Sequence, residues 1–497
     1  MPRGDPDRDL TAFEPPGAQF AWPQGIVDSQ ALRFELGKLF LGISGGTVRG
    51  ATVAGGTPMG VLDDRHMMTV AGSRAGKGRG VIVPNMLLYP GSVLATDPKG
   101  ELAALTARHR AQRLKQAVHI LDPFGITPAR LRHLRASFNP LAGLAAGAAR
   151  NAPGIVGDAA MIADALVVAG GKDPHWDESA RAFIEGLLLH VATWPAYDGS
   201  RHLVTVRRLL ARGAEGKDAD TFAPVRSMRL LEAEMRGNAA AFGIVQSAAA
   251  DFFDRPDNER DSVLSTARRH LKFLDLPELA GVLEGHGFEL ADLKRKGVTV
   301  YLCLPARHMD TCSRWLRLFV NLTLQAMEST PGRPARPVLF CLDEFHILGP
   351  MRQIETAAAQ IAGFGVKLWP VLQDLGQLKA LYGERWETFM GNAGVLQFFG
   401  NNDLTTLEWI SKRLGKTSIR TRRDSPVTSE QQRKGATGES WATEVHDLLT
   451  PEEIARFFSA TDSELRQLVI LPGLHPLVLR RAWYDTHEIF RGMADVE

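Results

Sequence analysis

The stretch AGSRAGKGRG, residues 71–80, combines glycines with one lysine in the manner of a phosphate-binding loop. In such a loop, backbone N–H groups curl round an anion in front of a helix N-terminus, and the lysine reaches the β- and γ-phosphates. The stretch meets the pattern G-x-x-x-x-G-K-[ST] at Gly76 and Lys77 but has Ala71 and Gly78 at the two ends. Gly78 is the larger departure, because a Ser or Thr there gives its hydroxyl to Mg²⁺. An ordinary glycine-rich turn explains the loop alone equally well.

The residues around the loop favour phosphate binding. The apolar run MMTVAGS (67–73) leads into it, as a strand would, and VIVPNMLL (81–88) follows it. Because Gly72 stands next to Ala71, it supplies part of the backbone freedom that a glycine at 71 would give. We therefore expect this loop to bind ATP through Gly72, Ser73, Arg74, Ala75, Gly76, Lys77, Gly78 and Arg79.

Two adjacent carboxylates provide a partner for the loop. RPVLFCLDEFHILG (336–349) is a predicted buried strand that runs into Asp343 and Glu344. On a parallel strand such a pair sits at the carboxyl edge of the sheet, where ligands bind. We expect Asp343 to hold Mg²⁺, directly or through water, and Glu344 to polarise the attacking water. A solvated acidic turn is the alternative, and the presence of the glycine–lysine loop in the same chain favours the catalytic interpretation.

Further polar residues follow other predicted strands. Gln373 ends the run GVKLWPVLQD (365–374), where it would contact the γ-phosphate or the water and act as a sensor, or simply occupy a turn. Asp97 and Lys99 lie at the end of the predicted strand GSVLATD (91–97). They line the nucleotide site or the interior of a ring, or they form a structural turn.

Strands that alternate with helical stretches predict an α/β fold with a doubly wound, mostly parallel sheet. Apolar residues at three- and four-residue spacing between about 150 and 275 predict an inserted all-α domain. Strand patterns resume at 297–305, and the polar segment 419–440 reads as a loop or linker between sheet elements. The expected domains are an N-terminal leader and entry segment at 1–60, a nucleotide-binding domain at 61–150 and 276–497, and the all-α insertion at 151–275.

Composition limits the class of protein. A hydrophobic fraction of 44% and a net charge of +2 are typical of a globular chain and neither demand nor exclude a nucleic-acid partner. Cys303, Cys312 and Cys341 form no C-x-x-C pair and are interpreted as buried thiols in a reducing compartment. No run of about 18 apolar residues is present, so we expect a cytoplasmic chain without a spanning helix.

Taken together, the motifs and their order resemble the type IV secretion coupling proteins of the TraG/VirD kind, the ATPases that deliver DNA in bacterial conjugation. The resemblance covers roughly residues 60–485, and many members also have glycine after the loop lysine. The stretches that carry it are AGSRAGKGRGVIVPNML, GSVLATDPKGEL, FNPL, LDEFHILG, LQDLGQLKALYG, FFGNNDLTTLEWISKRLGKTS, LLTPEEI and LPGLHPLVLRRAWYD.

This resemblance implies a RecA-like P-loop NTPase fold and a hexameric ring with nucleotide at the subunit interfaces. By position, Lys77 would bind phosphate, Asp343 and Glu344 would form the Walker B pair, and Gln373 would be the sensor. An arginine finger from the next subunit is expected, with Arg352 and Arg385 as candidates. Typical members open with membrane-spanning helices, which this chain lacks. We therefore expect that a separate membrane protein recruits this chain to the cytoplasmic face of the inner membrane. The alternative is that the chain works away from a channel.

Contact with DNA is predicted least directly. A basic cluster within SKRLGKTSIRTRRD (411–424) would neutralise DNA phosphates independently of the base sequence. The alternative is a solvated loop. Trp409 is the nearby aromatic residue on which a base could stack. The members of the cluster are Lys412, Arg413, Lys416, Arg420, Arg422 and Arg423.

The leading hypothesis is an ATPase that drives DNA or a DNA–relaxase complex toward a type IV secretion channel. One alternative is a DNA pump of the FtsK/HerA type without a secretion role. The other is a nucleotide-binding recruitment platform with little hydrolysis, which the absence of a hydroxyl at Gly78 keeps open and the Asp343–Glu344 pair argues against.

Overall fold

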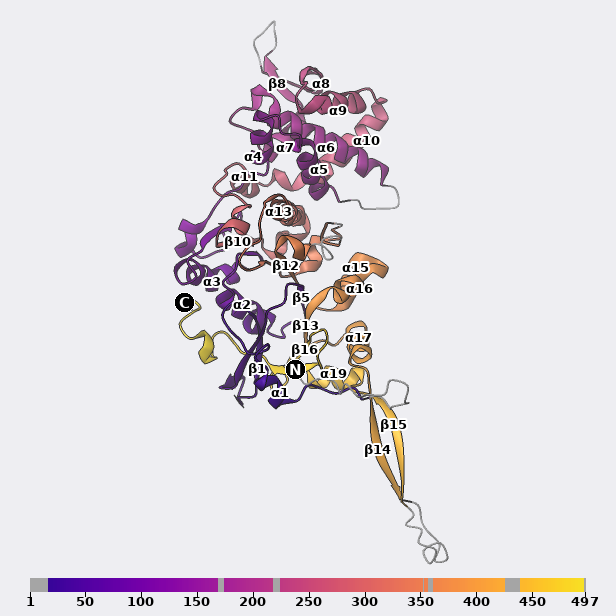
Figure 1. Cartoon of the computed structure of the whole chain (residues 1–497). Coiled ribbons are helices and arrows are strands. Elements are labelled where there is room, and N and C mark those ends of the chain that lie inside the picture. Colours follow the sequence, from indigo (N-terminus) through magenta and orange to yellow (C-terminus); the bar gives the residue numbers. More distant parts are fainter. Residues whose placement is uncertain are drawn as a thin grey trace, which may run out of the picture. The chain divides into compact units, whose positions relative to one another are not determined.

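The computed structural model describes residues 17–168, 174–217, 224–351, 353–355, 361–424 and 439–495. By its internal contacts the chain divides into two compact units (Figure 1). The first unit combines residues 1–90 with 367–497, and the second comprises residues 91–366. The first unit is therefore built from both ends of the chain.

The first unit is organised round a mixed sheet. The strand order is β4-β1-β17-β16-β13-β5-β12, in which β5 pairs in parallel with β13 and β12 while the other neighbours are antiparallel. The strands are β1 (Leu39–Ser44), β4 (Thr57–Val61), β5 (His66–Ala71), β12 (Val366–Leu372), β13 (Ala393–Phe399), β16 (Arg466–Ile470) and β17 (Leu477–Arg480). A short hairpin of β2 (Thr47–Arg49) and β3 (Thr52–Ala54) lies apart from this sheet.

The central strands of this unit are buried on both faces. Every residue of β5, β12 and β13 is buried, and most of them are apolar. Mostly apolar runs of this kind form strands that are covered on both sides, since a strand with one wet face would alternate. The helices of the unit are α1 (Pro23–Asp28), α2 (Val83–Leu88), α15 (Leu375–Tyr382), α16 (Trp386–Gly391), α17 (Leu404–Leu414) and α19 (Pro451–Phe457).

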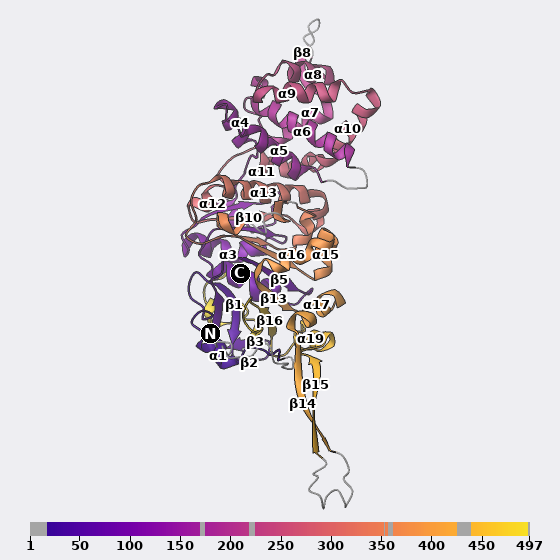
Figure 2. The same cartoon turned by 45° about the vertical axis from the view of Figure 1, so that its right-hand side comes forward.

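A long hairpin replaces part of the loop predicted at 419–440. Strand β14 (Lys416–Asp424) pairs antiparallel with β15 (Glu439–Asp447) over their whole length, from Lys416 opposite Asp447 to Asp424 opposite Glu439. Figures 1 and 2 show the two strands as a ribbon that extends beyond α17 and α19. The loop prediction was wrong at 419–424 and 439–440, because these residues are mostly polar and show none of the apolar alternation that marks a half-buried strand. The rest of the predicted loop, 425–438, lies outside the described residues.

The second unit has a parallel sheet in the order β11-β6-β10-β7. Its strands are β6 (Val93–Asp97), β7 (Ala117–Leu121), β10 (Val298–Cys303) and β11 (Val338–Leu342). Helices α3 (Glu101–Gln112), α12 (Asp292–Arg295) and α13 (Met309–Ser329) accompany them. Because the strands are parallel, their carboxyl ends share one edge, where Cys303 lies opposite Asp97.

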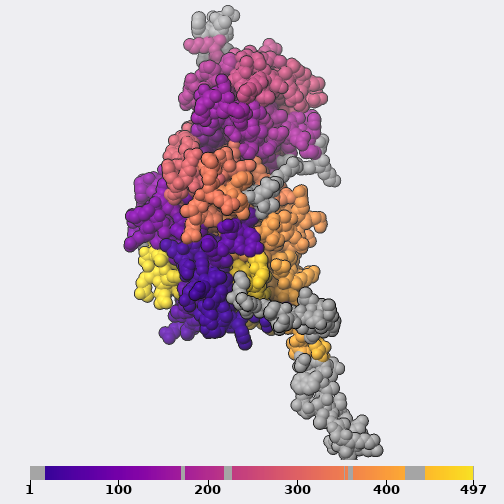
Figure 3. Space-filling model, viewed as in Figure 1, coloured from indigo at the N-terminus to yellow at the C-terminus, as the bar shows by residue number. Residues whose placement is uncertain are grey.

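Between β7 and β10 the chain is mainly helical, as its apolar spacing predicts. Besides α12, the described helices of this stretch are α4 (Ala142–Ala149), α5 (Ile155–Leu166), α6 (His175–Thr193), α7 (Leu203–Arg212), α8 (Met228–Gly237), α9 (Ile244–Phe253), α10 (Asp257–His270) and α11 (Pro277–Leu283). The rings of Phe183 on α6 and Phe252 on α9 stack with centroids 3.6 Å apart in their core. Figure 3 shows these helices, coloured purple to pink, as one continuous body. The stretch also holds a short hairpin of β8 (Ala214–Lys217) and β9 (Pro224–Ser227).

The exact domain boundaries stay a prediction. The three cysteines are buried free thiols, as their spacing suggested. Among the helices that the structure describes, none is long and apolar enough to cross a lipid bilayer.

Candidate functional site

The glycine–lysine loop leaves β5 at Ala71 and runs into a π-helical turn (Gly78–Ile82) followed by α2. It is curled rather than extended, because Arg74 (φ 58°) and Gly76 (φ 85°) both adopt left-handed backbone conformations. The N–H of Gly72 donates to the carbonyl of Phe399 (3.1 Å), and the N–H of Ala75 donates to the carbonyl of Gly72 (3.2 Å). A strand, a curled turn and a helix start therefore follow each other in the order that phosphate binding requires.

The glycines of the loop are required for different reasons. A Cβ at position 72 would lie 1.8 Å from the carbonyl oxygen of Gly400, so the end of β13 approaches too closely for any side chain. Gly76 combines its positive φ with contact to the ring of Trp483. At Gly78, by contrast, a Cβ meets no atom within 4 Å. The packing around position 78 would therefore admit a side chain with a hydroxyl.

Parts of the loop are open to a ligand. Ser73, Arg74 and Arg79 are exposed, while Lys77 and Gly78 are half-buried. Lys77 has right-handed helical backbone angles (φ −53°, ψ −46°) and begins the helical turn. Backbone N–H groups at the start of a helical turn are the groups that bind an anion in such loops.

Gln373 lies at the same sheet edge as the loop. Strand β12 runs parallel to β5 with Leu372 opposite Val70, so Gln373 follows β12 just where the loop follows β5. Its backbone N–H donates to Oε1 of Gln377 (3.0 Å), and its carbonyl accepts from Nδ2 of the buried Asn401 (3.1 Å). Asn401 was not among the predicted site residues; its proximity depends on the pairing of β13 with β5, which no local motif records.

The acidic pair follows β11 in the second unit. Every residue of β11 is buried, and Asp343 and Glu344 are half-buried. Glu344 adopts a left-handed backbone (φ 53°, ψ 44°), and its N–H donates to Oδ1 of Asp343 (3.0 Å). The hydroxyl of Thr96 on β6 donates to the carbonyl of Asp343 (2.9 Å). A left-handed conformation at a non-glycine residue costs on the order of 1–3 kcal/mol and is concentrated at functional sites.

The segment after this pair is anchored by a buried arginine. Arg317 on α13 donates through Nη1 to the carbonyls of Leu348 (2.6 Å) and Pro350 (2.9 Å). Within the same segment, Nδ1 of His346 lies 3.6 Å from Oε2 of Glu344. Arg317 was not among the predicted site residues, since an arginine on a helix gives no local sign of the loop that it contacts.

The carboxylate of Asp97 closes a turn after β6. Its Oδ2 accepts from the N–H of Ala103 (2.8 Å) and its Oδ1 from the N–H of Lys99 (3.3 Å). Burial raises the pKa of Asp97 to about 6, against the opposing effect of these backbone N–H groups. The side chain of Lys99 is 73% exposed and lies 4.0 Å from the carboxylate of Glu101.

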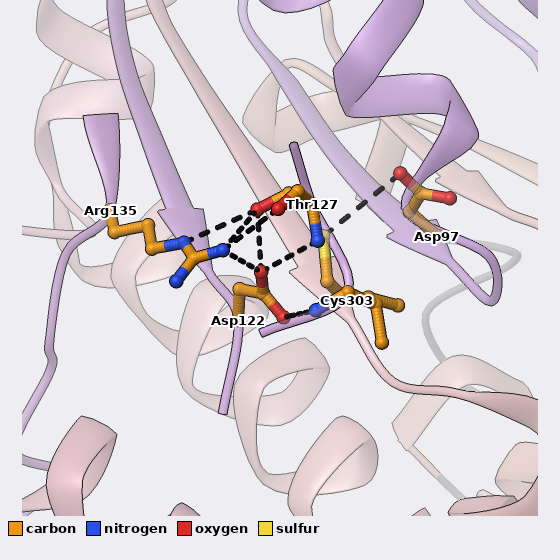
Figure 4. Close-up of polar contacts among 6 residues, drawn as sticks. Asp97, Asp122, Thr127, Arg135 and Cys303 are labelled. Atoms are coloured by element: carbon orange, nitrogen blue, oxygen red, sulfur yellow. Dashed lines mark hydrogen bonds and ion pairs between the residues drawn. The ribbon is translucent and has the colours of Figure 1, made fainter. Parts of the chain in front are cut away.

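A second Asp-Pro turn, at the end of β7, is built in the same way (Figure 4). The carboxylate of Asp122 accepts from the N–H groups of Ile126 and Thr127 (both 2.9 Å) and pairs with Arg135 at 3.1 Å. Cys303 at the end of β10 lies 4.0 Å from Oδ2 of Asp97, and burial raises its pKa well above the ordinary thiol value. These groups stabilise the turns at the sheet edge.

The predicted site residues thus fall in two groups. The loop and Gln373 belong to the first unit, and Asp343 and Glu344 belong to the second. Within the described residues, no group of three or more His, Cys, Asp or Glu side chains is arranged to hold a metal ion.

The predicted basic cluster begins on α17 and continues along β14. Lys412, Arg413 and Lys416 are exposed. The ring of Trp409 is half-buried and packs 5.7 Å from that of Phe398, so its face is partly used by the protein. Of the two arginine-finger candidates, Arg385 is exposed just before α16, and Arg352 lies outside the described residues.

A protein-family model described as "Type IV secretory system Conjugative DNA transfer" matches residues 37–495. The chain belongs to this family. It is 31% identical over 415 residues to the conjugal transfer protein TraG of Escherichia coli, a match that covers 79% of this chain and 61% of TraG. It is 29% identical over 442 residues to the protein VirD4 of Rhizobium rhizogenes, covering 87% of this chain and 60% of VirD4. The chain therefore spans about 60% of the length of these family members.

Solved structures of one coupling protein have the same fold. The unbound bacterial conjugative coupling protein TrwBdeltaN70 matches with a TM-score of 0.61 at 17% identity, over 91% of this chain and 96% of that one. The plasmid coupling protein TrwB in complex with the non-hydrolysable ATP analogue ADPNP matches with a TM-score of 0.60 at 17% identity, over 95% and 97%. The family member described here is thus a RecA-like P-loop α/β protein with a mostly helical segment within its second unit.

Proposed function

We propose that this chain is an ATP-hydrolysing coupling protein that recruits DNA, or a DNA–relaxase complex, and drives it toward a type IV secretion channel. Membership of the conjugative DNA transfer family supports the process. The single observation that supports the chemistry is the curled loop between β5 and α2, which has left-handed residues at Arg74 and Gly76 and places Lys77 at a helix start.

Each predicted site residue has a role in this proposal. The loop residues 72–79 hold the phosphates through backbone N–H groups, and Lys77 neutralises the β- and γ-phosphates. Glu344 polarises the attacking water, and Gln373 senses the γ-phosphate from the end of β12. The half-buried, left-handed Glu344 fits a base held in one orientation.

ATP and Mg²⁺ are the proposed cofactors, and solved structures of TrwB are described as complexes with ADPNP and with ADP and Mg²⁺. The donor set of this chain fits Mg²⁺, since that ion keeps several waters and takes one or two carboxylates together with phosphate oxygens. Asp343 supplies the carboxylate, whereas Gly78 supplies no hydroxyl. When bound, the ion neutralises charge on the phosphates.

The proposed partners are DNA or a DNA–relaxase complex, the components of the secretion channel and further copies of this chain. We expect a hexameric ring when the protein is active. We also expect a separate membrane protein to bring it to the cytoplasmic face of the inner membrane. The exposed Lys412, Arg413 and Lys416 are the proposed contacts with DNA phosphates.

ATP turnover by the purified protein, with and without single- and double-stranded DNA at low salt, tests this function. A motor predicts turnover that DNA stimulates and that Glu344→Gln abolishes. The competing candidate is a nucleotide-binding recruitment platform, which the missing hydroxyl at Gly78 favours. It predicts tight nucleotide binding with the same background turnover in wild type and Glu344→Gln, whether or not DNA is present. That second result would overturn the motor proposal.

A further inference from the structure

The segment that follows the last strand, Arg481–His487, lies against the glycine–lysine loop; we call it the C-terminal strap. The strap and the loop are about 400 positions apart in the chain and belong to the same compact unit. Arg481 is completely buried, and its Nη1 donates to the carbonyl of Ala75 (2.7 Å). The same guanidinium contacts the carbonyls of Leu465 (3.3 Å) and Ser459 (3.4 Å). One side chain therefore ties the loop to two other backbone segments.

The carbonyl of Ala75 needs such a donor. When successive N–H groups of a loop converge on an anion, the carbonyls between them turn away from it. A buried carbonyl without a partner is costly. Ala75 is 3% exposed, so water has little access to it, and Arg481 supplies the missing donor. Burial lowers the pKa of Arg481 to about 10, which still leaves it charged at neutral pH.

Trp483 of the strap fills the space above two loop glycines. A Cβ on Gly76 would lie 2.8 Å from the indole ring, and a Cβ on Gly80 would lie 2.7 Å from it. The indole Nε1 donates to the carbonyl of Ala51, which fixes the ring from its other end. Gly76 and Gly80 stand on either side of Lys77, so the ring limits how the backbone on both sides of the lysine can move.

A third contact holds the residue two positions after the lysine. Nε and Nη2 of Arg79 donate to the two carboxylate oxygens of Asp485 at 2.8 Å and 2.7 Å. The guanidinium lies 5.1 Å from the centroid of the Trp483 ring. The N–H of Tyr484 donates to the carbonyl of Arg79 (3.1 Å). The strap thus contacts the loop before, at and after Gly76.

We propose that the C-terminal strap holds the phosphate loop in its binding shape before a nucleotide arrives, with Arg481 and Trp483 as positioning residues. This inference rests on the proposed function, because it takes the loop to bind nucleotide. A loop that is already ordered loses less conformational freedom on binding, so the ordering appears as affinity. Loosening the strap should therefore weaken nucleotide binding more than it slows hydrolysis by the bound complex.

Trp483→Leu tests the proposal, since leucine is apolar but too small to cover both glycines. The readout is the equilibrium affinity for a fluorescent ADP analogue, together with KM and kcat for ATP. We expect the affinity to fall about tenfold, with kcat changed less than about twofold. Trp483→Phe should restore most of the affinity, and Trp22→Leu, at a residue that is 84% exposed, should leave it unchanged. Wild-type affinity in a folded Trp483→Leu protein would overturn the proposal, as would equal losses in kcat and affinity.

Asp485→Asn provides a second test if Trp483→Leu does not fold. The Arg79–Asp485 pair is partly exposed, at 42% and 32%, so its loss should leave the fold intact. We expect a two- to fivefold loss of affinity, the range of an exposed pair worth about 0.5–1 kcal/mol. Unchanged affinity here would contradict the proposal.

Lys77→Ala separates failure of the strap from failure of the proposed function. If Lys77→Ala binds the analogue like wild type, the loop is not a nucleotide site and the proposed function fails. If Lys77→Ala loses binding while Trp483→Leu and Asp485→Asn keep it, the strap proposal alone fails.

Discussion

At the scale of single residues, the free space at Gly78 distinguishes it from the other loop glycines. Since a Cβ there meets no atom within 4 Å, Gly78→Ser should fit without strain and return a hydroxyl to the position from which Mg²⁺ is usually held. One added ligand worth about 1 kcal/mol should lower the Mg²⁺ concentration for half-maximal ATP turnover about fivefold. A Mg²⁺ titration of turnover measures this.

Gly76→Ser is the matched control for that substitution. It introduces the same side chain two positions earlier, where φ is 85° and Trp483 lies in the way. We expect it to lose nucleotide binding. If both serine variants behave like wild type, the account of the loop is contradicted.

The buried carboxyl of Asp97 makes the stability of the protein depend on pH. Its pKa of about 6 lies above the unfolded value of 3.8, so the folded state favours the protonated form. The contribution of Asp97 to the free energy of unfolding is fully present below about pH 4 and is lost as pH rises through 6. A pKa difference of about two units corresponds to roughly 3 kcal/mol of that free energy. The free energy of unfolding of wild type, relative to Asp97→Asn, should therefore fall by about that amount between pH 4 and 7 in urea titrations.

The control for Asp97 is Glu101→Gln, at a side chain that is 71% exposed. The difference in free energy of unfolding between Glu101→Gln and wild type should stay nearly constant between pH 4 and 7. A wild-type curve parallel to that of Asp97→Asn would show that Asp97 ionises in the folded state as it does in the unfolded chain.

At the scale of elements, the basic residues at the junction of α17 and β14 have a measurable role if they contact DNA. Replacing Lys412, Arg413 and Lys416 by glutamine removes three exposed cations without touching the core. Each duplex phosphate contact contributes about 0.9 to the slope of log affinity against log salt. The slope should therefore become shallower by about two to three, and Arg49→Gln, an exposed cation on β2, should leave it unchanged. An identical slope in the triple variant would identify this cluster as a solvated surface.

The elements also show what the sequence alone can predict. Strands β5 and β11 were predictable because their apolar runs lead into chemically distinctive residues, the loop with Lys77 after β5 and Asp343 after β11. The hairpin of β14 and β15 was not, because its residues are mostly polar and carry no apolar period. Arg481, Trp483 and Asn401 were missed for a different reason. Their proximity to the loop or to Gln373 comes from strand pairing between distant segments, and a local motif contains no information about that pairing.

At the scale of the whole molecule, the proposed ring predicts that subunits complete each other's sites. Arg385 is exposed ahead of α16 and is the described candidate for the finger that reaches a neighbour. Arg385→Ala should keep nucleotide binding but lose most hydrolysis, because an arginine finger contributes on the order of 10³-fold or more to turnover. Mixing Arg385→Ala with Lys77→Ala should restore hydrolysis, since some interfaces then combine an intact loop with an intact finger. Mixtures that stay inactive at every ratio would remove Arg385 from this role.

ATP binding and ATP hydrolysis, measured side by side in Lys77→Ala and Glu344→Gln, test the proposed function most directly. In the proposed mechanism the loop binds the phosphates and the carboxylate after β11 polarises the attacking water. Lys77→Ala should therefore lose both binding and hydrolysis, while Glu344→Gln should bind ATP as tightly as wild type and hydrolyse almost none of it. Glu344→Gln turnover equal to that of wild type, or Lys77→Ala binding equal to that of wild type, would contradict these assigned roles.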